Sequence, residues 1–356
     1  MAISLERIPG RTIYLNGSPH LYFGGTAYLG LQSHPPFLEL FQRSAEAYGL
    51  HHGSSRKSNV SLEVYGLAEK QLARWAGSDN ALLMSSGFLA AQLVIQTLLD
   101  RGHPLFLLPN AHPALKVNGV FPSKSLSDLE QKIGRQIQTG GPLPVLLFDT
   151  IDFSTSLYPH FEALKKFPLD RVILVGDDSH GIGIVGSDGG GCYGMLRELR
   201  AAKLLVCCSL GKGPGVQAGA VFGEAEDLEI LRETAFYGGA SPPSPAWAGC
   251  LLEGGEIYSL RRQKLMENYK LFKARLHSLS QYDHLEGHPT FEFGDPNLAR
   301  TLEQKGFVIT NFNYPNAQGP LVGRIVLSAH HRGEDIEQLA DCLNDLSLRG
   351  PLVDNP

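Results

Sequence analysis

Two short apolar segments, each followed at once by ionisable residues, constrain the fold of this chain more than any other feature. Residues 171–176 read RVILVG and precede Asp177-Asp178-Ser179-His180, and residues 204–208 read LLVCC and precede Ser209-Leu210-Gly211-Lys212. Short runs rich in β-branched residues are typical of strands that are covered on both faces in a parallel sheet. Ligands of such sheets bind beyond the carboxyl ends of the strands, so we expect these ionisable residues to share one binding site.

The residue types at the two strand ends suit pyridoxal phosphate. A lone lysine, Lys212, stands in a glycine-rich loop, and Asp177 follows the other strand. In enzymes that use this cofactor a lysine forms the Schiff base and a carboxylate partners the pyridinium nitrogen, so that the ring can accept electrons from a carbanion. Each residue alone is better explained as a loop cap or a solvated turn residue. The two together favour the cofactor.

A third part of the same site is expected where residues 85–88, Ser-Ser-Gly-Phe, open an apolar helix. Unpaired backbone N–H groups at a helix start attract anions, which suits the phosphate of the cofactor. An ordinary capped helix start explains the local sequence equally well.

Length and composition indicate a soluble protein with a large and a smaller domain. The chain has 356 residues, of which 43% are hydrophobic and 19% charged, enough for a substantial core. Its 31 basic and 36 acidic residues give a net charge of −5, so we expect neither nucleic acid nor a membrane as a partner. The five cysteines form no CxxC pair, and no run matches a signal peptide or a membrane span. We therefore expect a cytoplasmic protein without disulfides or zinc.

Strands and helices alternate along most of the chain, which predicts βα units around a largely parallel sheet. A turn at Asn16-Gly17-Ser18 separates two strand-like runs, and a short helix is expected over 161–167. Composition becomes charged and helical over 245–279, so we place the start of a smaller α+β domain within this stretch. The predicted division is an N-terminal extended segment over 1–35, a large cofactor-binding domain over 36–255 and a small C-terminal domain over 256–356.

In the order and spacing of its motifs the chain resembles the α-oxoamine synthases. These are fold type I pyridoxal-phosphate enzymes, among them 8-amino-7-oxononanoate synthase and glycine C-acetyltransferase. Residues 28–31, YLGL, resemble the family's NYLGL, and residues 53–56, GSSR, its GSGGSR. SSGF at 85–88 is similar to SSGY, DDSH at 177–180 to DEAH, and SLGK at 209–212 to TLSK.

The resemblance runs from about Tyr28 to the last predicted helix. It implies an α/β fold in which a large domain holds a mainly parallel seven-stranded sheet between helices. A small C-terminal α+β domain would complete the chain.

The resemblance also implies a role for each matching residue. The catalytic residues would be Lys212 for the Schiff base, Asp177 for the pyridinium nitrogen, His112 stacked on the ring and His180 donating to its phenolic oxygen. The phosphate would be bound by Ser86, Gly87, Phe88 and Ser209. Arg324, which opens RIVLSAHH, would bind the substrate carboxylate bidentately. Ser55 is assigned to the substrate as well.

The activity implied is that of an acyltransferase. An amino acid would lose its α proton or carboxylate on the cofactor, and the resulting carbanion would attack an acyl thioester such as acyl-CoA, with decarboxylation. Lys212 would act as the general base. Fold type I enzymes assemble their sites across a dimer interface, so the resemblance implies a homodimer whose other partners are small molecules.

Departures from the family pattern keep other functions open. Ala27 replaces the Asn before YLGL, residues 57–61 lack the family's GTH, and the stretch from His112 to Phe148 is shorter. An aminotransferase or an amino-acid lyase would share the Asp and the Lys without the acyl-CoA features. A non-catalytic homologue that binds the cofactor without turnover is the remaining alternative.

Two further patterns do not lead to a function. Ser209 and Lys212 match the S-x-x-K of penicillin-recognising hydrolases, but neither SDN nor KTG follows them in the sequence. The histidine pairs at 51/52 and 330/331 are expected to be solvated or structural, because adjacent side chains rarely converge on one ion and no third ligand is spaced with them. No metal site is predicted.

Overall fold

The computed structural model describes residues 4–153, 157–314 and 316–348, and the chain divides into two compact units. One unit is His34–Ser259. The other joins the chain up to Ser33 with the chain from Leu260 onward. The division between them falls inside the helix α9 (Gly255–Arg275).

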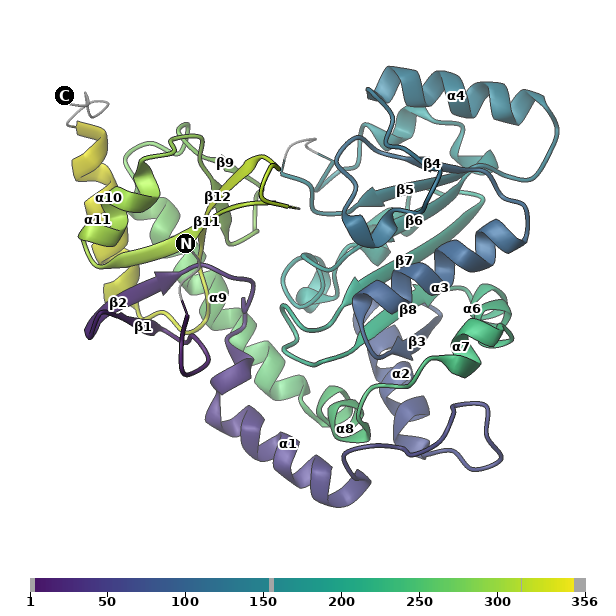
Figure 1. Ribbon diagram of the computed structural model, residues 1–356, viewed down its shortest axis with the longest axis horizontal. Coiled ribbons are helices and arrows are strands. Elements are labelled where there is room, and N and C mark those ends of the chain that lie inside the picture. The colour runs from purple at the N-terminus through teal and green to yellow at the C-terminus, as the bar shows by residue number, and fades with distance from the viewer. Residues whose placement is uncertain (1–3, 154–156, 315, 349–356) are drawn as a thin grey trace. The chain divides into compact units, whose positions relative to one another are not determined.

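The unit His34–Ser259 is built around a six-stranded sheet of order β3-β8-β7-β6-β5-β4 (Figure 1). Strands β4 to β7 run parallel, and β8 runs antiparallel to both of its neighbours, β7 and β3. The strands are β3 (Asn80–Met84), β4 (Leu105–Leu107), β5 (Val145–Asp149), β6 (Ile173–Asp177), β7 (Lys203–Ser209) and β8 (Gly219–Gly223). The largely parallel α/β architecture predicted from the sequence is confirmed.

Helices pack on this sheet, with α3 against β7 and β8 and α2 against β3. The helices of the unit are α1 (Pro35–Tyr48), α2 (Glu63–Ala76), α3 (Gly87–Asp100), α4 (Leu126–Gln138), α5 (Tyr193–Arg197), α6 (Ala225–Arg232), α7 (Ala235–Gly239) and α8 (Pro245–Glu253). Helix α2 ends where Gly77 takes the left-handed conformation, with φ of 72°. Glycine adopts it without the steric cost that other residues bear.

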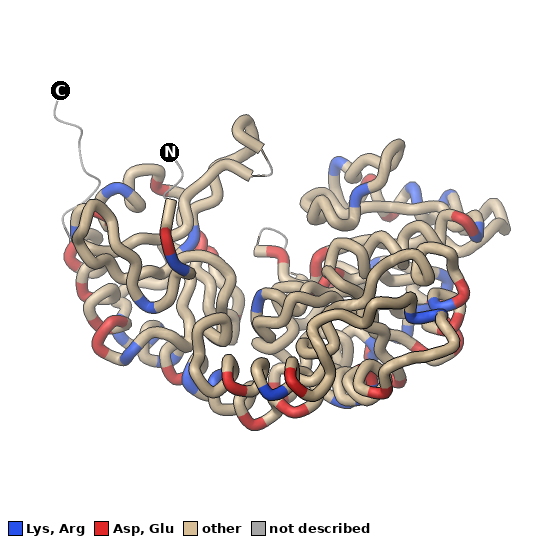
Figure 2. The backbone as a smooth tube through the Cα atoms, turned by 60° about the horizontal axis from the view of Figure 1, so that its bottom comes forward, with Lys and Arg blue, Asp and Glu red and all other residues tan. Residues whose placement is uncertain are grey.

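The strands are buried on both faces, which explains their nearly continuous apolar sequences. Leu147 and Val175 pack in one cluster with Val94 of α3, while their chain neighbours Leu146 and Leu174 are also fully buried. Charged residues of both signs are interspersed along the helices (Figure 2). The only charged residues in the six strands are Asp149, Asp177 and Lys203. Two carboxylates therefore stand at neighbouring strand ends, where burial of a charge is costly.

The sheet of this unit has fewer strands than the sequence analysis predicted, and it ends at β4. The family resemblance led us to expect seven strands, and the described residues form six in this sheet. One parallel bridge, between Leu107 and Pro122, stands beside β4. Proline has no N–H to donate to a ladder, so the bridge does not extend into a strand there. The helix expected over 161–167 is likewise one 3₁₀ turn, Leu164–Lys166.

The other unit holds a second six-stranded sheet, of order β1-β2-β11-β12-β10-β9 (Figure 1). Its elements are β1 (Thr12–Leu15), β2 (Ser18–Phe23), β9 (Asp283–His284), β10 (Thr290–Glu292), α10 (Leu298–Gln304), β11 (Phe307–Asn313), β12 (Leu321–Val326) and α11 (Gly333–Leu348). The predicted turn is confirmed, because Asn16 and Gly17, with φ of 48° and 81°, connect the antiparallel strands β1 and β2. Strand β2 pairs in parallel with β11, so this hairpin completes a sheet made from the C-terminal part of the chain. In the described ranges, no helix is both long and apolar enough to span a membrane.

Candidate active site

The carboxylate of Asp177 is oriented by a short relay of hydrogen bonds between two strand ends. Its Oδ1 accepts from the backbone N–H of Ser179 at 2.9 Å and from the Ser179 hydroxyl at 2.5 Å. The same hydroxyl oxygen accepts from the N–H of Ser209, 2.8 Å away at the end of β7. Within the described part of the chain these are the hydrogen bonds that the carboxylate accepts, so Oδ2 is left for a bound partner.

Lys212 and His180 are brought together by the parallel pairing of β6 with β7. His180 follows β6, Lys212 follows β7, and His180 Nε2 lies 3.0 Å from Lys212 Nζ. The two loops approach closely at Gly213, where a Cβ atom would lie 2.5 Å from the carbonyl oxygen of Ile182. The sequence predicted one site for these residues, and the structure places them in contact.

The N-terminus of α3 lies against the end of β7. Ser86 caps the helix by accepting a hydrogen bond from the N–H of Leu89 at 3.2 Å. A Cβ atom on Gly87 would lie 2.7 Å from the Cα of Ser209, so only glycine allows this approach. The first N–H groups of a helix have no intrahelical acceptor and carry its positive dipole end. Ser86, Gly87, Phe88 and Ser209 thus form a cradle suited to an anion.

His112 lies beside the same strand ends. Its backbone N–H donates to Asp149 Oδ2 at 2.8 Å, and its Nδ1 accepts from the N–H of Ala114 at 3.1 Å. Burial lowers the pKa of His112, the charge of Asp177 acts in the opposite direction, and Lys212 lowers the pKa further. The imidazole is therefore kept neutral, within electrostatic reach of both Asp177 and Lys212.

Asp149 is a residue of this site that the sequence analysis did not select. It stands opposite Asp177 in the parallel register of β5 and β6. Burial, and then the neighbouring charge of Asp177, raise the pKa of Asp149 well above its usual range. Two adjacent carboxylates, here the buried Asp177 and the half-buried Asp149, do not readily ionise together, so the pair favours a neutral Asp149. The sequence could have indicated Asp149 by its position, since it ends an apolar strand just as Asp177 does.

The two residues assigned to the substrate lie elsewhere in their units. Arg324, on β12 of the unit that contains both chain ends, donates from Nε to Glu292 Oε1 on the paired strand β10 at 2.5 Å. Ser55 donates from its hydroxyl to the carbonyl oxygen of Gly238 at 2.7 Å. These contacts do not test the assignments, which stay predictions.

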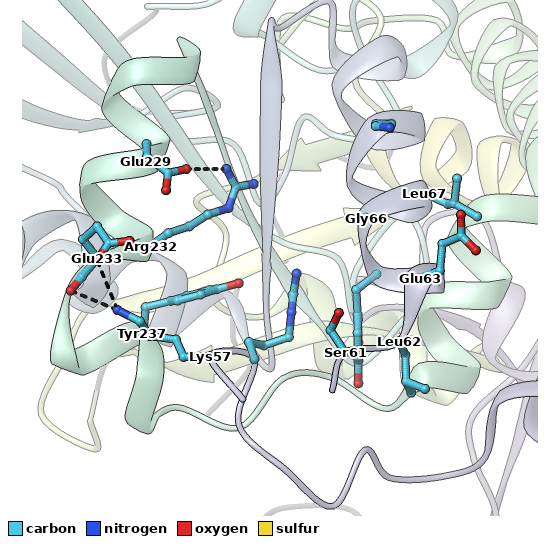
Figure 3. Close-up of a pocket in the computed structure, with 13 residues that line it drawn as sticks. Lys57, Ser61, Leu62, Glu63, Gly66, Leu67, Glu229, Arg232, Glu233 and Tyr237 are labelled. Carbon is cyan, nitrogen blue, oxygen red and sulfur yellow. Dashed lines mark hydrogen bonds and ion pairs between the residues drawn. The ribbon is translucent and has the colours of Figure 1, made fainter. Parts of the chain in front are cut away.

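A separate pocket of about 410 Å³ opens between the start of α2 and the segment from α6 to α7 (Figure 3). Three of its basic side chains pair with acidic groups: Lys57 with Glu233 at 3.5 Å, Arg232 with Glu229 at 3.5 Å, and Arg56 with the buried Glu69 at 3.0 Å. Because these basic groups already have carboxylate partners, we assign no ligand to the pocket.

The chain is similar over most of its length to known proteins. A serine palmitoyltransferase from Sphingomonas wittichii has the same fold, with a TM-score of 0.80 and 17% identity over 98% of this chain and 92% of that one. An 8-amino-7-oxononanoate synthase from Aliivibrio fischeri is 29% identical over 94% of this chain and 91% of its own length. The chain is a homologue of the α-oxoamine synthases.

The α-oxoamine synthase fold is found again in a second solved structure. The 8-amino-7-oxononanoate synthase from Francisella tularensis gives a TM-score of 0.68 at 18% identity, covering 93% of this chain and 98% of that one. No family model matches the chain. The resemblance drawn from the motifs and the fold type I architecture are both confirmed.

Proposed function

We propose that this chain is a pyridoxal-phosphate-dependent acyltransferase of the 8-amino-7-oxononanoate synthase type, which joins an amino acid to an acyl-CoA with loss of CO₂. One observation carries the proposal: Lys212, His180 and Asp177 meet at the carboxyl ends of β6 and β7. Relatives named 8-amino-7-oxononanoate synthase match nearly the whole chain, which supports the choice of reaction.

The residues present fit the cofactor. Its aldehyde needs a lysine, its ring nitrogen a carboxylate and its phosphate a cradle of donors. Lys212, the Oδ2 atom of Asp177 and the N-terminus of α3 supply these three groups within one unit. When bound, the cofactor supplies an electron sink that stabilises negative charge on the α carbon of an amino acid.

The side chains of this site would then have distinct tasks. Asp177 would hold a proton on the ring nitrogen, and Ser179 keeps its carboxylate in a fixed orientation. The neutral, half-buried ring of His112 would provide a flat surface for stacking. Lys212 would remove the α proton of the amino acid through Nζ, and His180 Nε2, 3.0 Å away, fixes the position of that amine.

The remaining roles extend the proposal beyond the cofactor. Arg324 would bind the carboxylate of the amino acid with its planar guanidinium, and Ser55 would contact the substrate. We further propose a homodimer in the cytoplasm whose ligands are small molecules.

The first test is the absorption spectrum of the purified protein with added pyridoxal phosphate. In wild type we expect a visible band that borohydride abolishes while the cofactor becomes covalently attached, with peptide mass spectrometry placing it on Lys212. The Lys212→Ala variant should show neither effect, whereas Lys70→Ala, which removes an exposed lysine of α2, should behave as wild type.

An activity assay then separates the candidate reactions. Release of CoA from pimeloyl-CoA in the presence of alanine is the expected result, and Lys212→Ala should lower the rate about 10²–10⁴-fold, the usual contribution of a general base. A keto acid formed from the amino acid without CoA release would instead indicate an aminotransferase. Bound cofactor with no turnover would indicate the non-catalytic homologue.

A further inference from the structure

Asp178, next to the predicted catalytic Asp177, is buried where the ends of β5 and β6, strand β7 and the start of α5 meet. Its side chain is 1% exposed. Oδ1 accepts from the hydroxyl of Thr150 at 2.5 Å, just after β5, and Oδ2 accepts from the N–H of Cys192 at 2.9 Å, just before α5. The backbone N–H of Asp178 donates to the carbonyl of Cys207 on β7 at 2.8 Å. One residue thus connects β5, β6, β7 and the start of α5.

The carboxylate of Asp178 is also enclosed by two glycines. A Cβ atom on Gly181 would lie 2.0 Å from Oδ1, and one on Gly191 would lie 2.0 Å from Oδ2. The carbonyl of Asp178 accepts from the N–H groups of Gly181 and Ile182, both at 3.0 Å. The segment between β6 and α5 is therefore folded around this single side chain.

That segment carries His180 and contacts the loop of Lys212. His180 Nε2 lies 3.0 Å from Lys212 Nζ, and Gly183 packs against Pro214, where a Cβ atom would come within 3.3 Å of the proline ring. A shift of the segment would move His180 relative to Lys212, and Asp177 with Ser179 relative to β7.

Asp178 has no basic partner in the described part of the chain, although burial of an unpaired carboxylate is costly. Thr150 and Cys192 satisfy the carboxylate with neutral donors alone. We infer that Asp178 is a positioning residue, whose buried carboxylate fixes the turn that presents Asp177 and His180 to the cofactor. This inference rests on the proposed function, since it assigns a role within the same site.

We expect asparagine at position 178 to preserve the hydrogen bonds that hold this turn, and alanine to lose them. In Asp178→Asn the amide oxygen can accept from Cys192, and the amide NH₂ can donate to the Thr150 hydroxyl, which also lies 3.2 Å from the carbonyl of Asp177 and can donate there. In Asp178→Ala the N–H of Cys192 loses its acceptor, the Thr150 hydroxyl keeps only its contact with the carbonyl of Asp177, and the space between the glycines is left empty. The Asp188→Asn variant is the matched control, because Asp188 is an exposed acid on the same segment.

The experiment uses two readouts on folded protein at neutral pH, with folding checked by circular dichroism. The ring nitrogen resonances of His180 are followed by NMR in the cofactor-free protein with labelled histidine, and are assigned by their loss in His180→Gln. The dissociation constant of pyridoxal phosphate is measured by equilibrium dialysis. We expect Asp178→Ala to shift the His180 resonances and to weaken cofactor binding about 10–100-fold, as for outer-shell partners of other bound groups. Asp178→Asn and Asp188→Asn should both resemble wild type.

Unchanged His180 resonances and affinity in folded Asp178→Ala would overturn the inference, as would an Asn variant as impaired as the Ala variant. If Asp178→Ala does not fold, Thr150→Val, which removes one donor at constant shape, replaces it and should shift His180 in the same way. If wild type binds no pyridoxal phosphate but the resonances still shift in Asp178→Ala, the proposed function fails while the positioning role of Asp178 stands.

Discussion

The hydrogen bonds of the buried His331 side chain require a neutral imidazole ring. Its ring stacks on Phe23 at a centroid distance of 3.9 Å. Nδ1 accepts from the N–H of Ser328 at 3.0 Å, so the proton sits on Nε2, which lies 2.9 Å from the carbonyl oxygen of Tyr22. A second proton on Nδ1 would face the Ser328 N–H group. Burial accordingly lowers the pKa of His331 to about 4, which makes it one of the structural histidines that the sequence analysis anticipated.

This lowered pKa predicts acid sensitivity in the unit that contains both chain ends. An unfolded histidine binds a proton below about pH 6.5, whereas folded His331 does so only near pH 4, so stability is lost as pH falls between these values. The shift corresponds to about 3 kcal/mol in the free energy of unfolding. Urea titrations of wild type and His331→Gln from pH 7 to pH 4 should show the gap between them closing by about that amount. His277→Gln, which removes an exposed histidine of the same unit, should keep the wild-type pH dependence.

Helix α3 depends on contact between its first residue and the end of β7. Gly87→Ala would place a Cβ atom 2.7 Å from the Ser209 backbone, so the helix start must retreat. We expect a loss of about 1–3 kcal/mol in the free energy of unfolding, as for other overpacked sites, together with weaker binding of pyridoxal phosphate. Gly66→Ala on α2, where a Cβ atom meets nothing within 4 Å, should instead stabilise the protein by about 0.5–1 kcal/mol. Equal stability and equal cofactor affinity in both variants would contradict the role given to this helix start.

The elements that the sequence predicted well are those whose pattern is local. β6 and β7 follow from apolar runs, and the turn at Asn16-Gly17 follows from residues that tolerate positive φ. The contacts that complete the site are not local. Asp149 becomes significant only through its register with Asp177, and Thr150 reaches Asp178 only because β5 and β6 are neighbours. Strand order is set by packing across the whole sheet, which no single stretch of sequence encodes.

The number of strands shows the opposite limit, because the family resemblance implied seven strands and the described residues form six in this sheet. Pro122 makes a single bridge with Leu107, and a residue without an N–H group does not continue a ladder. The pairing of β2 with β11 was also beyond local reasoning, since it joins the two ends of the chain in one sheet. Predictions of such pairing need tertiary information that hydrophobic periodicity does not contain.

The division of the whole molecule into two compact units predicts two unfolding transitions. Both tryptophans, Trp75 and Trp247, lie in His34–Ser259, so their fluorescence reports on that unit alone, whereas far-ultraviolet circular dichroism reports on both. At about pH 5 the unit that contains His331 is the weakened one. In urea at that pH we therefore expect circular dichroism to fall before tryptophan fluorescence changes.

Pyridoxal phosphate should separate the two transitions further at the same pH. A ligand at 100 times its dissociation constant adds about 2.7 kcal/mol to the stability of the part that binds it. Lys212 lies in the unit that both tryptophans report on, so the fluorescence midpoint in urea should rise with cofactor while the earlier phase in circular dichroism stays in place. Lys212→Ala should reduce the shift, because the covalent link is lost. Coincident curves by both probes, moving together with cofactor, would instead show that the two units unfold as one cooperative body.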